Sequence, residues 1–235
     1  DVNGTECYYF GYEMAPYLAT GDYTIAATVG TTTVTKNLDL TTYADKVIEQ
    51  YPDNDDAQNL VKAVLNYVAV ASKHMGVYTQ GYDTTNNYAD APAKTVVSAA
   101  AINTMSNVNA YITGASLDLN AAPAWAFTIA DGADISDLVI KVDGKNVKYT
   151  VERGRVIVEL RAYDMLDTIT VEIGGKTGEY NFAAYYTAMK ALADGFTWPT
   201  NYQAGANNAG AIASDAMPLL DAFYTYASYA AYCQQ

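Results

Sequence analysis

Several residue types are scarce in this 235-residue sequence, and each scarcity excludes a class of function. It has one histidine and two cysteines, too few ligands for a zinc site built from imidazole and thiolate groups. Lys and Arg number 13 against 26 Asp and Glu, for a formal charge of −13. Such a surface repels nucleic acid and anionic membranes, since both bind clustered positive charge. No apolar run approaches the ~20 residues that cross a bilayer, so membrane insertion is not expected.

Catalytic patterns are scarce too. His74 is the only histidine, and there is no G-x-S-x-G sequence to supply a serine nucleophile. Glu13, Glu159 and Glu172 could pair for glycoside hydrolysis, which uses two carboxylates. The alternative is that they are solvent-facing acids on strands. We expect no enzyme, no catalytic residue and no metal site.

The acidic run Asp53-Asn54-Asp55-Asp56 has two interpretations. Its oxygen atoms could hold calcium, although the glycine and the distal glutamate of an EF-hand loop are missing. Alternatively, Asp55 or Asp56 caps the helix that follows. No cofactor other than calcium is suggested by the sequence.

Composition favours an extracellular or cell-surface protein. Half of the residues are hydrophobic, and the sequence has 22 Tyr. Cys7 and Cys233 lie near opposite ends, so a disulfide between them would join the termini in an oxidising compartment. Two unrelated thiols are the alternative.

The most regular stretch is Leu60–Met75, whose apolar residues recur at helical spacing. A preceding helix could be capped by Thr41 or Thr42. We therefore expect an antiparallel helical hairpin at 41–77. Residues 1–40 instead favour strands, with alternation from Tyr23 to Val29 and a β-branched run over Thr31–Leu38.

A second β-rich segment is expected at 115–181, after a linker and a helix within 78–114, the helix covering Lys94–Tyr111. Trp125, Phe127 and Ile129 would share one strand face, and Asp143-Gly144 and Arg153-Gly154 mark hairpin turns. Residues 182–235 predict a second helical hairpin. It has a long inserted loop over Gly195–Ser214, with Pro218 in the first turn of the closing helix.

The two halves repeat each other. Leu60, Ala63 and Tyr67 fall on Leu219, Ala222 and Tyr226 at a shift of 159 positions. Earlier in each half, Leu40 and Tyr43 match Phe182 and Tyr185 at a shift of 142, and the stretch from Ile25 to Gly30 matches that from Ile169 to Gly174. Each unit is therefore a β-module followed by a helical hairpin. We expect the first β-module to be truncated.

The strings Tyr43-Ala44-Asp45 and Leu60-Val61-Lys62-Ala63-Val64-Leu65-Asn66-Tyr67 resemble segments of large surface or secreted proteins of gut and rumen Firmicutes. In those proteins an LVKAMLNYGAAAQ-like helix follows immunoglobulin-like strands. Val68 stands here where glycine is usual. The resemblance implies an extracellular scaffold or adhesion role and transfers no catalytic residue.

The expected fold is α+β, with immunoglobulin-like β-sandwich modules alternating with antiparallel helical hairpins. The expected function is non-catalytic, structural or adhesive, in a bacterial surface or exported assembly that can polymerise by strand sharing. A truncated module leaves unpaired strand edges, which an upstream fragment of the same precursor or a neighbouring subunit would complete. The alternative is a carbohydrate-binding module that stacks a glycan on the loop aromatics Phe196, Trp198 and Tyr202.

Overall fold

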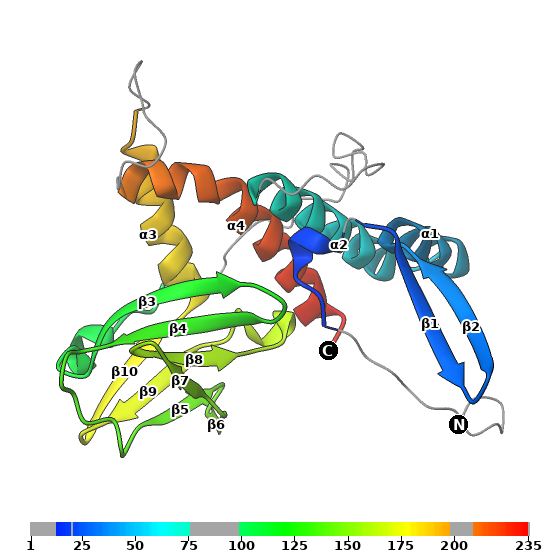
Figure 1. Ribbon diagram of the computed structural model, residues 1–235. Coiled ribbons are helices and arrows are strands. Elements are labelled where there is room, and N and C mark those ends of the chain that lie inside the picture. Colours follow the sequence, from blue (N-terminus) through cyan, green and yellow to red (C-terminus); the bar gives the residue numbers. More distant parts are fainter. Residues whose placement is uncertain (1–12, 20, 76–98, 198–208, 235) are drawn as a thin grey trace.

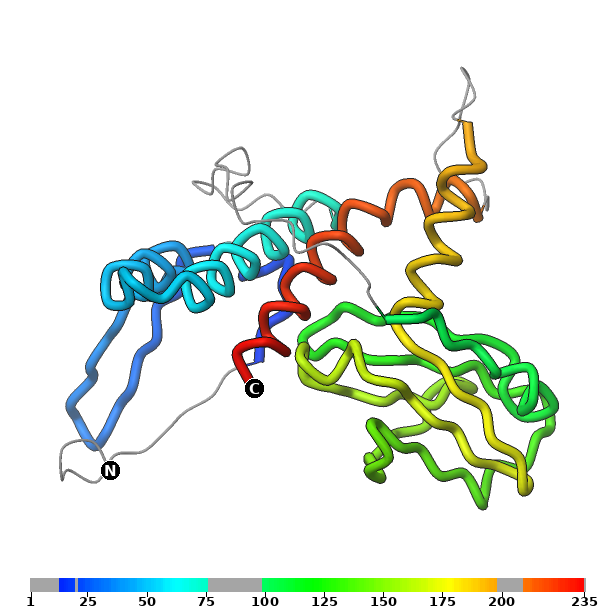
Figure 2. Tube along the Cα trace, turned by 180° about the vertical axis from the view of Figure 1, so that it is seen from behind, coloured from blue at the N-terminus to red at the C-terminus, as the bar shows by residue number. Residues whose placement is uncertain are grey.

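The computed structural model describes residues 13–19, 21–75, 99–197 and 209–234. In these residues the protein is a mixture of α-helices and antiparallel sheets (Figure 1). The helices form a layer across the molecule, with two four-stranded sheets below one end and a separate two-stranded hairpin below the other (Figures 1 and 2).

The two larger sheets are built from residues 112–180. The first has the strand order β3 (Ile112–Leu119), β4 (Pro123–Ile129), β8 (Arg155–Glu159) and β7 (Thr150–Glu152). The second has the order β10 (Lys176–Tyr180), β9 (Ile169–Ile173), β5 (Val139–Val142) and β6 (Lys145–Asn146). All neighbouring strands run antiparallel.

Both predicted hairpin turns are present. Asp143 and Gly144 join β5 to β6 with φ angles of 48° and 72°, and Arg153 and Gly154 join β7 to β8 with 51° and 74°. Two successive positive φ angles are typical of the type I′ turn, whose twist matches that of the strands. The chain after Asp143-Gly144 is divided between the two sheets, because β6 ends at Asn146 and β7 belongs to the other sheet.

A single core joins both sheets to the helices. Trp125 and Phe127 of β4 and Ile169 and Val171 of β9 are completely buried and belong to one cluster. Phe223, from the last helix, belongs to the same cluster and is also fully buried. The alternating apolar residues of β9 thus lie on the inner face of their sheet, as their period of two predicts.

Four α-helices occur in the described residues: α1 (Leu40–Gln50), α2 (Asp55–His74), α3 (Phe182–Asp194) and α4 (Ala209–Tyr232). Helix α1 packs on α2, α3 packs on α4, and α2 packs on α4. The ring of Tyr67 lies 5.4 Å from that of Phe223 and 5.7 Å from that of Tyr226, centroid to centroid. Tyr67 and Tyr226 are equivalent in the sequence repeat, so the two halves meet through the same position of each.

The helix caps differ from the predictions by a few residues. Asp39, not Thr41 or Thr42, caps α1, and its carboxylate accepts a hydrogen bond from the Thr42 N–H at 2.7 Å. Asn54, not Asp55 or Asp56, caps α2 by accepting from the Ala57 N–H at 3.0 Å. Asp and Asn are good caps because a short side-chain oxygen reaches a free N–H of the first turn. The two aspartates lie in that first turn, where the helix dipole favours negative charge.

Two other expectations are wrong. The described part of the predicted helix over Lys94–Tyr111, residues 99–111, contains only the short 3-10 helix η3 (Met105–Val108). The backbone of this segment instead forms hydrogen bonds with the end of β10. The Thr104 N–H donates to the Glu179 carbonyl, and the Asn181 N–H donates to the Ile102 carbonyl. These tertiary hydrogen bonds outweigh the weak helix propensity of a Thr- and Asn-rich segment.

Helix α4 begins at Ala209, within the stretch predicted to be a loop over Gly195–Ser214, so Pro218 lies inside the helix. An interior proline removes a backbone hydrogen bond and crowds the preceding turn, and both views show α4 changing direction along its length (Figures 1 and 2).

The remaining strands, β1 (Tyr23–Val29) and β2 (Thr32–Leu38), form a two-stranded antiparallel hairpin that leads directly into α1. A two-residue turn with Gly30 at a φ of 62° closes it. The short 3-10 helix η1 (Pro16–Leu18) precedes the hairpin and packs on α2. The hairpin projects away from the helices and lies apart from the larger sheets (Figures 1 and 2).

Candidate functional site: an exposed amphipathic hairpin

The β1–β2 hairpin has one apolar face and one polar face. Residues opposite each other in an antiparallel pair lie on the same face. The apolar face therefore combines Tyr23 with Leu38, Ile25 with Lys36, Ala27 with Val34, and Val29 with Thr32. The other face pairs Thr24 with Asn37, Ala26 with Thr35 and Thr28 with Thr33, and hydrogen bonds of 2.9 Å link the first and last of these pairs.

The apolar face is exposed to solvent in the structure. Ile25 is 50% exposed, Val29 82%, Val34 65% and Leu38 45%. A two-stranded hairpin is marginally stable by itself and is normally stabilised by a surface that covers its apolar face. The alternation of apolar and polar residues expected from Tyr23 to Val29 is therefore present, but its apolar side is not buried as such a pattern predicts.

The equivalent hairpin of the second unit is buried. In β9, Ile169 and Val171 are 0% exposed and Ile173 is 2% exposed. The β9–β10 hairpin also leads directly into a helix, α3, whose cap Asn181 accepts from the Ala184 N–H at 3.0 Å. The same sequence pattern therefore has opposite burial in the two halves of the molecule.

The two hairpins differ in length. The β1–β2 register contains seven residue pairs and the β9–β10 register five. When the two hairpins are aligned from the ends that lead into α1 and α3, Tyr23 and Ile25 fall on Ile169 and Val171. The sequence repeat had placed Ile25 on Ile169, so the alignment of β1 moves by two residues. The inward face is unchanged, because a shift of two residues preserves the side of the sheet on which each side chain lies.

The exposed face continues onto helix α1. Tyr43 is 61% exposed. Its repeat equivalent Tyr185 lies edge-on to Trp125, with ring centroids 5.5 Å apart, and burial raises the pKa of the Tyr185 hydroxyl. In the second unit this helical tyrosine covers the tryptophan of the sheet. No tryptophan covers Tyr43 among the residues that the structure describes.

The charged groups of the hairpin's apolar face and of its junction with α1 lie toward the helix. The Lys36 ammonium group is the one cationic group on the apolar face, opposite Ile25. At the helix junction, hydrogen bonds from the Thr42 side chain and backbone lower the pKa of the Asp39 carboxyl. Asp39 is therefore ionised at neutral pH and caps the start of α1.

Of the residues predicted to bind a glycan or to form the disulfide, only Phe196 and Cys233 lie among the described residues. Trp198, Tyr202 and Cys7 lie outside the described residues, so the glycan site and the disulfide stay predictions. Phe196 is half-buried, and its Cβ lies 2.8 Å from the position that a Cβ on Gly210 of α4 would occupy. Cys233 is exposed, with its Sγ 3.9 Å from the Asp56 carbonyl oxygen.

The acidic and histidine candidates are dispersed. Glu13 and Glu159 line one hollow of about 210 Å³ together with Arg155. Glu172 lies on the other sheet, where its carboxylate accepts a 2.6 Å hydrogen bond from the Lys141 ammonium. The imidazole Nδ1 of His74 lies 3.9 Å from the Asp215 carboxylate. In the described ranges no three His, Cys, Asp or Glu residues are grouped as a metal site.

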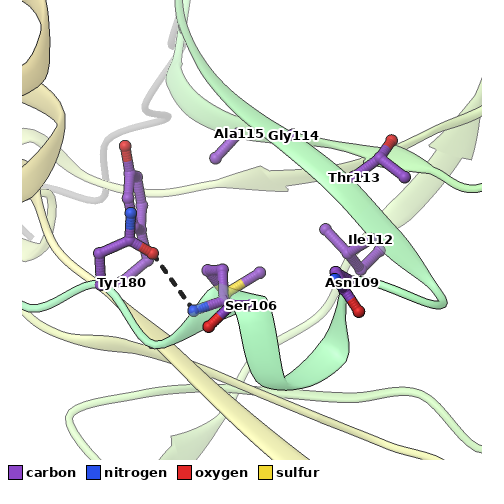
Figure 3. A pocket seen from close by; sticks show the side chains of 9 residues that line it. Ser106, Asn109, Ile112, Thr113, Gly114, Ala115 and Tyr180 are labelled. Atoms are coloured by element: carbon purple, nitrogen blue, oxygen red, sulfur yellow. Dashed lines mark hydrogen bonds between the residues drawn. The ribbon is translucent and has the colours of Figure 1, made fainter.

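A hollow of about 420 Å³ lies where η3 and β3 approach the end of β10 (Figure 3). Ser106, Asn109, Thr113 and Tyr180 line it, and the Met105 N–H donates to the Asn103 side-chain oxygen at 3.2 Å. Its polar groups are neutral amides and hydroxyls. It therefore has no charged group that could select an ionic ligand.

No protein-family model, no curated protein and no solved structure matches this chain. Among the helices that the structure describes, none combines the length and apolar character needed to span a membrane. The exposed hairpin is thus the strongest candidate site, and its geometry is the basis for assigning a role.

Proposed function

We propose that this chain is a non-catalytic structural or adhesive protein of a bacterial surface or exported assembly, and that it joins other polypeptides by sharing β-strands at the β1–β2 hairpin. The observation that carries the proposal is the exposed apolar face of that hairpin, with Ile25 50% and Val34 65% exposed. Exposed apolar surface next to an unpaired strand edge is a template for association.

Two further features support this role. Strand β1 pairs only with β2 among the described strands, so its second edge is open to an added strand. The net charge of −13 keeps copies of the chain apart in solution, which favours association through specific apolar contacts over general aggregation.

The finer description of the fold belongs to the same proposal. We take the two four-stranded sheets to be an immunoglobulin-like sandwich, the arrangement of the Firmicute surface proteins that the sequence resembles. Their antiparallel order and their common core around Trp125 support it. The tyrosine-rich, acidic composition supports an extracellular or cell-surface location.

Analytical ultracentrifugation tests the proposed assembly. The full chain is sedimented alone over a range of concentrations, and again with a polypeptide of residues 99–168, which contains β3 to β8 but no closing hairpin. The second arm is read only after far-UV circular dichroism shows that this polypeptide holds β-structure by itself. Wild type is expected to enter a larger species in at least one arm. Ile25→Glu should abolish that species, because it places a charge on the apolar face while forming a cross-strand pair with Lys36.

Thr35→Glu is the matched control. It adds the same charge to the same hairpin, but on the polar face opposite Ala26, and should associate as wild type does. A wild-type chain that stays monomeric in both arms, or equal loss of association in both variants, contradicts the proposed function.

A further inference from the structure

The second unit of the molecule shows what covers a hairpin of this kind. On the side away from β10, β9 pairs with β5, with Ile140 opposite Val171 and Val142 opposite Ile169. The apolar face of β9 lies in the same core cluster as Trp125 and Phe127 of the facing sheet. Strand pairing and face burial are thus both supplied by strands β3 to β8, which precede the hairpin.

The first unit has the hairpin and the helices but no such strands in its described residues. Residues 13–19, 21 and 22, which precede β1 in the structure, contain η1 and no strand. Three positions that are covered in the second unit are exposed to solvent in the first. Ile25, Leu38 and Tyr43 occupy the positions of Val171, Tyr180 and Tyr185.

We propose that the β1–β2 hairpin is completed by a β-module of the same kind as residues 112–168, carried on another polypeptide segment and lacking its own closing hairpin. This inference rests on the proposed function and names the partner of its site. A strand equivalent to β5 pairs antiparallel with β1, and an aromatic residue equivalent to Trp125 packs on Tyr43.

A second copy of this chain fits the site less well. Its β-module is already closed, because β5 pairs with β9 and the β9–β10 face is buried. Two hairpins packed face to face would bury little surface. Seven residues in a strand span about 23 Å and two strands about 10 Å, so each face covers roughly 230 Å², against the ~800 Å² per partner of a standard interface.

One difference between the hairpins predicts how the partner differs from residues 112–168. Lys36 occupies the position of Gly178, where an added Cβ would lie 2.8 Å from a Val108 methyl and 3.1 Å from the Met105 sulfur. A partner with a turn like η3 at this point would collide with Lys36. The partner therefore leaves this position open, and an acidic group there would pair with the ammonium.

The experiment is a hairpin exchange within the full chain. In the first chimera, Tyr23–Ala27 replaces Ile169–Ile173 and Val34–Leu38 replaces Lys176–Tyr180 around the native Gly174-Gly175 turn. Glycine stands in place of Lys36, so that Tyr111, Met105 and Val108 keep their positions. Because the transplanted face should cover Trp125, we expect one cooperative thermal transition, with a Tm within about 10 °C of wild type. Buried-tryptophan fluorescence should be retained.

The control chimera places Thr24–Thr28 and Thr33–Asn37 at the same two strands around the same turn, again with glycine at the position of Gly178. The turn and nearly all of the sequence are the same, but the slip of one residue turns the polar face inward. It should lose the cooperative transition of the β-module. Equal loss in both chimeras overturns the inference.

The two tests fail separately. If the first chimera unfolds like the control, the hairpin face does not close a β-module and the inference is wrong, whereas association through Ile25 in either sedimentation arm would still support the proposed function. If the full chain alone associates through Ile25, the occupant is a second copy and the inference is wrong. If neither sedimentation arm shows association, the proposed function itself fails.

Discussion

At the scale of single residues, the structure separates side chains of identical type by what surrounds them. Tyr43 and Tyr185 occupy equivalent helical positions, yet one is 61% exposed and the other lies against Trp125. The repeat in the sequence identifies the equivalence. It cannot identify the difference, because exposure depends on strands that are far from the tyrosine in the chain.

Tyr180 provides a pH prediction at this scale. Burial raises the pKa of its hydroxyl to about 12, with a smaller contribution from Tyr185. A raised folded-state pKa means that stability is complete below the unfolded value near 10 and is lost as the pH rises from about 10 to 12. Tyr180→Phe should therefore lose less stability across this range than wild type, measured by urea unfolding at pH 9, 10 and 11.

The comparison between wild type and variant isolates Tyr180 from the other tyrosines, which ionise in both proteins. A variant whose stability falls as steeply as that of wild type between pH 9 and 11 would contradict this account. Phenylalanine keeps the ring against Trp125, with which the Tyr180 ring makes an edge contact at 5.4 Å.

At the scale of elements, local patterns predicted most of the strands and helices. The type I′ turns, the alternation of β9 and the helices α1 to α3 all depend on residues close together in the sequence. The predictions failed where distant contacts decide the conformation. The segment 99–111 follows the edge of β10 because of hydrogen bonds to Glu179 and Asn181, residues about 75 to 80 positions later.

A matched pair of substitutions tests the opposite burial of the two hairpins. Ile25→Thr should change the free energy of unfolding by less than about 0.5 kcal/mol, because the side chain is half exposed and threonine suits a strand. Val171→Thr should cost about 1–3 kcal/mol, because it buries a hydroxyl group in an apolar core.

Guanidinium unfolding of both variants, followed by far-UV circular dichroism, gives the two values. Equal destabilisation would show that the isolated chain covers Ile25 in solution, which would remove the basis for a binding role of the hairpin. No change in Val171→Thr would contradict the packing of β9.

At the scale of the whole molecule, helices and sheets share one core. Phe223 of α4 is fully buried, and its ring lies 5.8 Å from that of Phe182 and 5.4 Å from that of Tyr67. It therefore contacts α2 and α3 at once, and its cluster extends to Trp125. We expect the helical layer and the two larger sheets to unfold together.

Phe223→Ala should lower the free energy of unfolding by about 3–5 kcal/mol, the usual cost of removing a buried aromatic side chain. Tryptophan fluorescence and the helical signal in circular dichroism should shift to the same lower denaturant concentration. Tyr51→Ala, at an exposed aromatic residue just after α1, is the control and should change little. Two separate transitions in the variant would show that sheets and helices are independent units.

The sequence by itself determined the features that depend on near neighbours. These are the α+β composition, the hairpin turns and the repeated order of hairpin and helices. It also indicated the amphipathic pattern of β1, which is the basis of the candidate site.

Only the tertiary structure decided which copy of the repeated pattern is buried. Ile25 and Val171 have similar side chains in equivalent hairpins, and both fit a covered sheet face. Val171 is buried because β5 and the facing sheet are present to cover it, whereas no described strand covers Ile25. Burial depends on the partner as well as on the residue, and this physical difference makes the first hairpin, and not the second, a candidate binding surface.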